Sequence, residues 1–175
     1  MRNLHLSYNS NLEAVENMKR VWAPWRMQYV TAKKDEDCFL CIKSKESRDK
    51  ENYLVYRGKK AFVALNIFPY NNGHLMVSPY RHLVDFEELS DDESMEIVSL
   101  IKKSIAALKK LMKPDGFNVG ANIGRVAGAG ENHFHVHVVP RWLGDTNFMP
   151  VVAETKVISE HLQETYEKLS AVFHD

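Results

Sequence analysis

The chain has 175 residues, of which 45% are apolar and 26% are charged, a composition typical of a globular protein with one hydrophobic core. Its 23 basic residues balance 23 acidic ones, so it lacks the basic excess expected of a nucleic-acid-binding protein. No apolar run is long enough to cross a bilayer and no secretion signal stands at the start, so we expect a cytoplasmic protein without a membrane partner.

The N-terminal part of the chain divides into an extension and the start of a domain. Residues 1–17 are polar and without strong periodicity, which predicts an extension. Aromatic residues then gather in VWAPWRMQY, residues 21–29, so we expect a single domain over residues 18–175. The charge-rich stretch 31–52 contains CFLC and predicts irregular structure held in place by something local.

Three strands are expected next. Residues 53–57 and 61–66 flank a glycine-containing turn, which predicts a hairpin. Residues 74–80 predict a third strand, which is closed by Pro79.

A long helix is expected over residues 90–112. Apolar side chains recur there at three- and four-residue steps and form one stripe. Ser90 followed by Glu93 is a capping-box pattern at the start, and Pro114 ends the helix.

Two more strands and a second helix complete the chain. Residues 116–123 and 133–140 predict strands, and residues 153–171 predict a helix. The order of strands, long helix, strands and helix predicts an α+β domain with helices packed against an antiparallel sheet.

Three histidines alternate with apolar residues in HFHVHV, residues 133–138. Side chains two positions apart on a strand point to the same face, so His133, His135 and His137 share one face while the apolar residues pack on the core. Burying three imidazoles without polar partners costs several kcal/mol. We therefore expect this face to meet a polar ligand, in preference to being an ordinary solvated sheet face.

Two chemistries suit such a histidine face. The imidazoles can chelate zinc, or one of them can attack phosphorus while its neighbours hold the transferred group. The glycine-rich loop GRVAGAG, residues 124–130, stands just upstream and can offer backbone N–H groups to phosphate oxygens. It lacks the lysine and hydroxyl of a P-loop, so only its combination with the histidines favours phosphate chemistry.

With Pro140 and Arg141 behind it, the His-x-His-x-His pattern resembles the histidine triad superfamily of nucleotide hydrolases and transferases. The segments VWAPWRMQY, LNIFPYNNGHLMVSPYRH and NVGANIGRVAGAGENHFHVHVVPRW are each similar to family segments, and they stand in the family's order. The W-A-P-W-R and A-G-A-G segments are most similar to the bacterial diadenosine tetraphosphate phosphorylase-like branch.

This resemblance implies a half-barrel of about five antiparallel strands packed with two main helices, and a homodimer without an organic cofactor. It also implies a two-step reaction. His135 would attack the α-phosphorus of a nucleotide, and water or inorganic phosphate would discharge the nucleotidyl-histidine. His137 would donate to a phosphate oxygen or the leaving oxygen, and His74 would support the triad from a neighbouring strand.

The resemblance further implies contacts to the substrate. Asn66 matches a polar position near the nucleotide, and Asn122 matches one near the phosphates. Gly128, Ala129 and Gly130 would cradle phosphate oxygens with backbone donors. Considered without the family, the two asparagines are more simply turn or strand-edge residues.

Cys38 and Cys41 form a second candidate site. In a cytoplasmic protein CxxC is half a metal site or a redox pair, and the βαβ context of the redox motif is missing. A tetrahedral zinc needs two further ligands, for which His82 and His133 are the candidates, and related family members support that set. Such a zinc would be structural. The alternative is two partly buried thiols and a surface histidine.

The sequence therefore predicts a nucleotidyl transferase or hydrolase that cleaves a dinucleoside polyphosphate of the diadenosine tetraphosphate type. A nucleoside phosphoramidase or another nucleotide hydrolase on the same scaffold is the related alternative. The alternatives from other classes are a nucleotide-binding module without catalysis and a zinc hydrolase that uses the three histidines as ligands.

Overall fold

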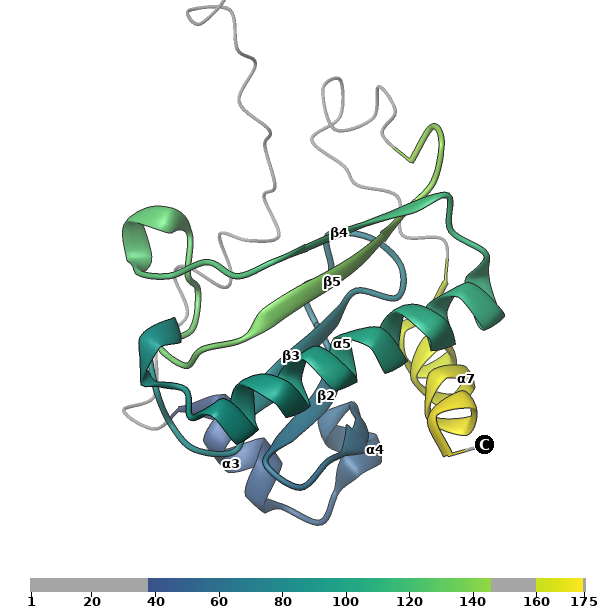
Figure 1. Cartoon of the computed structure of the whole chain (residues 1–175). Helices are drawn as coiled ribbons and strands as arrows, with labels where there is room; N and C mark the ends of the chain where they lie inside the picture. The colour runs from purple at the N-terminus through teal and green to yellow at the C-terminus, as the bar shows by residue number, and fades with distance from the viewer. Residues whose placement is uncertain (1–37, 146–159, 175) are drawn as a thin grey trace, which may run out of the picture.

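The computed structural model of the protein describes residues 38–145 and 160–174. Its five strands form one antiparallel sheet in the order β1-β2-β3-β5-β4 (Figure 1). The strands are β1 (Leu54–Arg57), β2 (Ala61–Leu65), β3 (Leu75–Pro79), β4 (Gly116–Gly120) and β5 (Val136–Arg141). The helical elements are α3 (Phe39–Lys45), α4 (Asp49–Asn52), η1 (Phe86–Glu88), α5 (Asp91–Met112), η2 (Arg125–Ala127) and α7 (Leu162–His174). The predicted α+β class with a five-stranded antiparallel sheet is confirmed.

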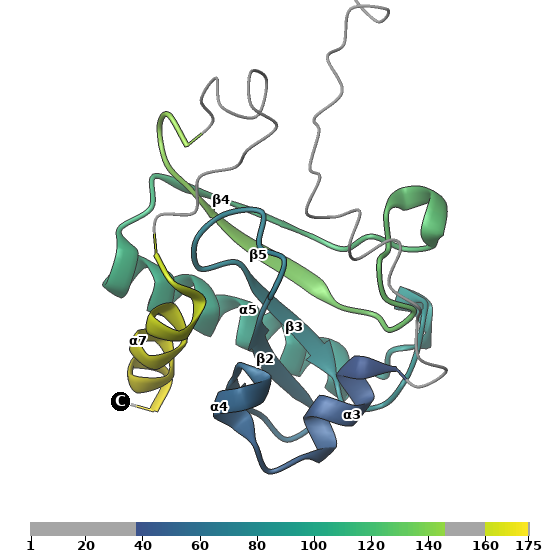
Figure 2. The ribbon, with the colours of Figure 1, turned by 180° about the vertical axis from the view of Figure 1, so that it is seen from behind.

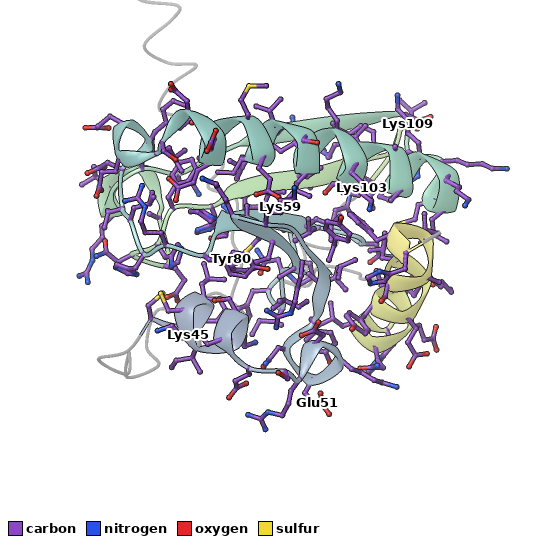
Figure 3. The ribbon with its side chains drawn as sticks, turned by 60° about the horizontal axis from the view of Figure 1, so that its bottom comes forward. Lys45, Glu51, Lys59, Tyr80, Lys103 and Lys109 are labelled. Carbon is purple, nitrogen blue, oxygen red and sulfur yellow. The ribbon has the colours of Figure 1, made fainter. Side chains whose placement is uncertain are left out.

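Helices cover the two faces of the sheet. α5 runs across one face with α7 beside it, and the larger core lies between them and the sheet (Figure 1). Seen from behind, α3 lies by the other face, where Leu40 packs against Phe62 and Met76 in a smaller core (Figure 2). Tyr80, labelled in Figure 3, packs against this smaller core. Because β2 is buried on both faces, its sequence reads as a continuous apolar run.

The long helix begins and ends where the sequence predicts. Ser90 caps α5, since its hydroxyl accepts from the Glu93 N–H at 3.3 Å while its own N–H donates to the Glu93 carboxylate at 2.9 Å. Lys113 then adopts a left-handed conformation, with φ of 48°, directly before Pro114. No helix within the described ranges is long and apolar enough to span a membrane.

The expectation of irregular structure over residues 31–52 is wrong for most of the part that the structure describes, residues 38–52. Residues 39–45 and 49–52 are the helices α3 and α4. These helices have 7 and 4 residues, which is too short for an apolar period to be visible in the sequence. α3 is instead fixed by packing, because Leu40 is buried against the sheet.

The two strands beside the glycine-rich loop are shorter than predicted at that end. β4 stops at Gly120 and β5 starts at Val136, three residues later than expected. The last pairs of these ladders join Gly120 to His137 and Val77 to Val136. Beyond these pairs the chain leaves the sheet and forms the projecting loop that contains η2 (Figure 1).

Two other expectations fall partly or wholly outside the described residues. The predicted C-terminal helix is found as α7, but residues 146–159 lie outside the described ranges. The boundary between residues 17 and 18 also lies outside them.

Candidate active site

The three alternating histidines lie at the start of β5. His137 is within the strand and pairs with Met76, so both side chains are on the sheet face that carries the smaller core. His133 and His135 stand just before the strand and are buried. The intervening apolar residues belong to the larger core on the opposite side, as the alternation predicts: Phe134, Val136 and Val138.

A backbone carbonyl determines which ring nitrogen of His135 carries the proton. Its Nδ1 lies 2.7 Å from the carbonyl oxygen of His133, and a carbonyl oxygen can only accept. Nδ1 is therefore the N–H, and Nε2 carries the lone pair. Burial lowers the pKa of His135, which keeps the ring neutral at physiological pH. Nε2 has no hydrogen-bond partner among residues 38–145 and 160–174.

His137 carries its ring proton on Nε2 instead of Nδ1, and a hydrogen bond from His74 determines this. The backbone N–H of Tyr70 donates to Nδ1 of His74 at 3.0 Å, so the neutral His74 ring has its proton on Nε2. That nitrogen lies 3.0 Å from Nδ1 of His137 and donates to it. A neutral His137 then holds its proton on Nε2. His74 is fully buried and stacks on Tyr70 with ring centres 4.8 Å apart, so this relay is rigidly placed.

The two rings of His135 and His137 are in edge-to-face contact, with centres 4.7 Å apart. One ring thus presents a lone pair and the other an N–H from neighbouring positions. A nucleophile beside a hydrogen-bond donor is an arrangement suited to displacement at phosphorus or at a carbonyl.

A Cys₂His₂ group lies next to this pair, as the sequence predicts. Cys38 precedes α3, Cys41 lies in its first turn, and both thiols approach the ring of His133. Their sulfur atoms are 3.2 and 3.4 Å from its Nδ1, and Cys41 Sγ is also 3.4 Å from Nδ1 of His82. All four ligand atoms lie within 4.8 Å of one another.

These distances fit a tetrahedral metal ion. Zinc bonds of about 2.3 Å to sulfur and about 2.1 Å to nitrogen place such ligand atoms about 3.6 Å apart. The Nε2–H of His133 donates to the Pro79 carbonyl at 3.0 Å, which leaves the lone pair on Nδ1 facing the thiols. Burial raises the pKa of the Cys41 thiol to about 11 and lowers the pKa of His133 to about 4, so a metal must displace a thiol proton but meets a neutral imidazole.

The alternative in which the three histidines chelate one zinc ion has no support in the described part of the chain. His133 faces the thiols, while Nδ1 of His135 faces a carbonyl. Among the described residues, the cluster of Cys38, Cys41, His82 and His133 is the one group of metal-binding side chains close enough to share an ion.

The predicted substrate-binding residues lie in two places. The side chain of Asn66 accepts from the Phe68 N–H at 2.9 Å and so shapes the loop before β3. The side-chain amide of Asn122 donates to the carbonyl of Gly128 at 3.4 Å and so ties the glycine-rich loop to the residue that precedes it by two positions. Gly128 has φ of 92°, a conformation that favours glycine.

The glycine-rich loop borders the metal-binding group. A small hollow there is lined by Asn122 before the loop, by Arg125 and Ala129 within the loop, and by His133 after it. Gly130 is half-buried in the same loop.

Comparison with known sequences and structures places this site in a family. The sequence model of the HIT domain matches residues 47–142, more than half of the chain. The chain belongs to the HIT family. The AP-4-A phosphorylase of Mycobacterium tuberculosis is 38% identical to it, over 95% of this chain and 90% of the relative. The adenosine 5'-monophosphoramidase of Schizosaccharomyces pombe is 36% identical over 44% of this chain and 55% of its own length.

Solved structures of HIT proteins share the fold. A hypothetical histidine triad nucleotide-binding protein from Sulfolobus tokodaii superposes with a TM-score of 0.62 at 32% identity, covering 78% of this chain and 89% of that one. A zinc-bound histidine triad family protein from Mycobacterium smegmatis superposes with a TM-score of 0.63, covering 79% and 94%, and at 24% identity it shows the common fold alone. The chain is thus a HIT-family enzyme whose Cys₂His₂ group can hold a metal ion.

Some residues that hold the HIT histidines escaped the sequence analysis. The carbonyls of Pro79 and Leu83 and the hydroxyl of Ser78 all bond to residues 133–134. Ser78 alone had a signal in the sequence, because it is a polar residue at the end of an otherwise apolar strand.

Proposed function

We propose that the chain is a nucleotidyl transferase that cleaves a dinucleoside polyphosphate of the diadenosine tetraphosphate type at the α-phosphate. The pair of His135 and His137 carries this proposal, because one ring has its lone pair on Nε2 and its neighbour has a proton there. The name of the Mycobacterium tuberculosis relative supports the same substrate class.

The reaction proceeds in two displacements. Nε2 of His135 forms a bond to the α-phosphorus while the bond from that phosphorus to the bridging oxygen breaks. With diadenosine tetraphosphate the leaving group is ATP, and His137 gives it the Nε2 proton. Inorganic phosphate then attacks the adenylyl-histidine, the P–N bond breaks, ADP leaves, and a proton returns to His137. We propose phosphate as the acceptor in preference to water, since the relative with 38% identity is named a phosphorylase.

The remaining predicted residues hold the substrate. His74 fixes the ring of His137. Asn66 serves the nucleotide, and Asn122 and the loop residues 128–130 serve the phosphates. The N–H groups of Gly128 and Ala129 donate to the carbonyls of Arg125 and Gly124 at 3.0 and 3.2 Å, so these bonds must be shared or broken when the loop binds phosphate. The position of this loop beside His133 and its lack of side-chain bulk support that role.

Cys38, Cys41, His82 and His133 hold a structural zinc ion. The distances among the four ligand atoms and the orientation of His133 support this assignment. With four protein ligands the ion has no open position and supplies stability instead of chemistry. The four residues join α3 and the loop after β3 to the segment 133–135, which carries His135, so they hold that segment in place.

The protein acts as a homodimer in the cytoplasm and folds as a single domain from residue 18. The edge strand β4 supports the dimer, because Val119, the fourth of its five residues, is 46% exposed. Size-exclusion chromatography with light scattering tests the dimer.

The test of the reaction is incubation with diadenosine tetraphosphate in the presence and absence of inorganic phosphate. ADP with ATP as products supports phosphorolysis, whereas AMP with ATP means hydrolysis by the same residues. Turnover of adenosine phosphoramidate alone favours the phosphoramidase, which the Schizosaccharomyces pombe relative suggests. Intact-mass measurement without acid detects an adenylyl group attached to the protein. An adenylyl group on any residue other than His135 contradicts the mechanism.

A further inference from the structure

The catalytic segment 133–135 is held in place without the help of the β-ladder. β5 pairs with β3 from Val136 onward, and the last pair joins it to Val77. Residues just outside a ladder lose the regular backbone bonds that fix their peptide planes. Other groups therefore hold the backbone from which the His135 side chain projects.

Ser78 supplies one of these groups, directly beyond the last ladder pair. Its hydroxyl donates to the carbonyl oxygen of Phe134 at 2.9 Å, so a side chain takes the place of the missing backbone donor. Ser78 is 0% exposed and Phe134 is 3% exposed, so water does not substitute for this bond.

The bond acts on the peptide unit that joins Phe134 to His135. The ring of His135 bonds back to the carbonyl of His133, two residues earlier, at 2.7 Å. The loop closed by this bond contains the whole of Phe134, so the Phe134 backbone conformation decides whether Nδ1 of His135 reaches its acceptor. A rotation of the Phe134 carbonyl away from Ser78 opens that loop.

The other bonds to the segment cannot be changed as cleanly. The Phe134 N–H donates to the carbonyl of Leu83 at 2.7 Å, which is a bond between backbone groups. The bond from His133 to Pro79 involves a residue of the metal-binding group. Among the residues that the structure describes, Ser78 is the one that bonds the segment through its own side chain without belonging to the metal-binding group or the histidine pair.

We propose that Ser78 is a positioning residue for His135. Its hydroxyl fixes the Phe134 carbonyl and thereby keeps the Nδ1–H of His135 on the carbonyl of His133, with the lone pair on Nε2. The effect on turnover rests on the proposed function, whereas the effect on the ring of His135 does not.

The chain offers a matched control in Ser104. This serine is also 0% exposed, but it lies on α5, and its hydroxyl has no hydrogen-bond partner among residues 38–145 and 160–174. The variants S78A and S104A each remove one buried hydroxyl from the full chain. Only S78A removes a bond to the catalytic segment.

Three measurements compare the variants with the native protein. The first is steady-state turnover of diadenosine tetraphosphate, well below both thermal midpoints. We expect S78A to lose roughly tenfold in kcat with KM changed less than about twofold, while S104A keeps both values. The second is the thermal midpoint, which we expect to fall by a few degrees in S78A alone. The third is the long-range ¹H–¹⁵N spectrum of histidine rings, in which S78A shifts or broadens the Nδ1–H signal of His135.

The results for S78A and S104A decide the role of Ser78. An unchanged His135 ring signal with unchanged kcat in folded S78A overturns the proposal, and equal losses in S78A and S104A reduce Ser78 to a packing residue. If the native protein does not turn over the dinucleotide, the proposed function fails, but the ring spectra still decide the role of Ser78. Should S78A not fold, S78C replaces it, because a thiol is a weak donor of similar size. A native ring signal and native kcat in S78C would also overturn the proposal.

Discussion

His133 and His135 are two residues apart and both are buried, yet their ring protons sit on opposite nitrogens. His133 donates from Nε2 to the Pro79 carbonyl, so its Nδ1 lone pair faces two thiols. His135 donates from Nδ1 to the His133 carbonyl, so its lone pair is on Nε2. In each ring a backbone carbonyl selects the tautomer, and the tautomer leaves one ring with a lone pair that can bind a metal and the other with a lone pair that can act as a nucleophile.

The metal-binding group and the catalytic pair also differ in how they are assembled. Cys38 and His133 are 95 positions apart in the chain, so the group forms only when the folded chain brings distant segments together. The catalytic pair is local, because His135 and His137 are two positions apart in the chain. We therefore expect substitutions in the metal-binding group to lower the stability of the protein, and substitutions in the catalytic pair to lower its activity.

The largest effect on chemistry is expected from H135N. The variant removes the Nε2 lone pair, and we expect kcat for diadenosine tetraphosphate to fall roughly 10⁴-fold or more, with the thermal midpoint nearly unchanged. Steady-state assays and intact-mass measurement check this, since no adenylyl-protein should form. His174 is exposed on α7, so H174N is the control with native activity. A turnover number within tenfold of native in H135N would remove His135 from the mechanism.

The largest effect on stability is expected from C41S. Loss of a structural metal is among the few single changes that cost more than about 4 kcal/mol of unfolding free energy. We expect zinc content near zero by atomic spectroscopy and a clear fall in the denaturation midpoint. A chelator should destabilise the native protein and leave C41S unaffected. Full stability of C41S, or purified protein without zinc, would contradict a structural metal.

Much of the fold follows from local patterns in the sequence. The capping box of Ser90 and Glu93 and the regular apolar steps locate α5 almost to the residue. α3 and α4 carry no such signal, because contacts with the sheet fix these short helices. The strand ends at Gly120 and Val136 depend on where two ladders stop, and that is a property of the whole sheet.

The candidate site also has features that local sequence predicts and features that depend on distant contacts. Alternation alone puts three histidines on one face, and the CxxC pattern alone suggests a metal. The proton positions on His135 and His137 could not be predicted, because they depend on a carbonyl and on His74, which is 63 positions away from His137. Ser78 was missed for a similar reason, since its partner Phe134 is 56 positions away.

A smaller effect on chemistry is expected from H74F. Phenylalanine keeps a flat ring beside Tyr70 but cannot donate to Nδ1 of His137, so the proton on that ring is no longer held at Nε2. We expect kcat to fall about tenfold to a hundredfold, with His135 still able to form the adenylyl-protein. Single-turnover kinetics should show slower departure of ATP. Native rates in H74F would mean that His137 does not depend on this relay.

The smallest effect is expected from E93Q, which probes the loop that leads to His82. The carboxylate of Glu93 binds Arg81 at 2.8 Å and caps α5, and the Arg81 guanidinium is the main cause that lowers the pKa of Glu93 to about 2. Because this pKa is below its usual value of 4.5, the carboxylate stabilises the fold above pH 4.5, and the contribution is lost as the pH falls towards 2. Arg81 is half exposed, so solvent screening reduces the effect, and we expect E93Q to cost about 1 kcal/mol at pH 7.

The difference between native and E93Q unfolding free energies should therefore shrink as the pH is lowered from 5 to about 2.5, as urea denaturation can measure. E87Q is the control, because Glu87 is exposed and forms neither contact. A pH-independent difference would mean that the cap and the ion pair do not stabilise the protein through the Glu93 charge. If E93Q also lowers zinc affinity while kcat stays native, the loop of His82 serves the metal-binding group and leaves the catalytic pair unaffected.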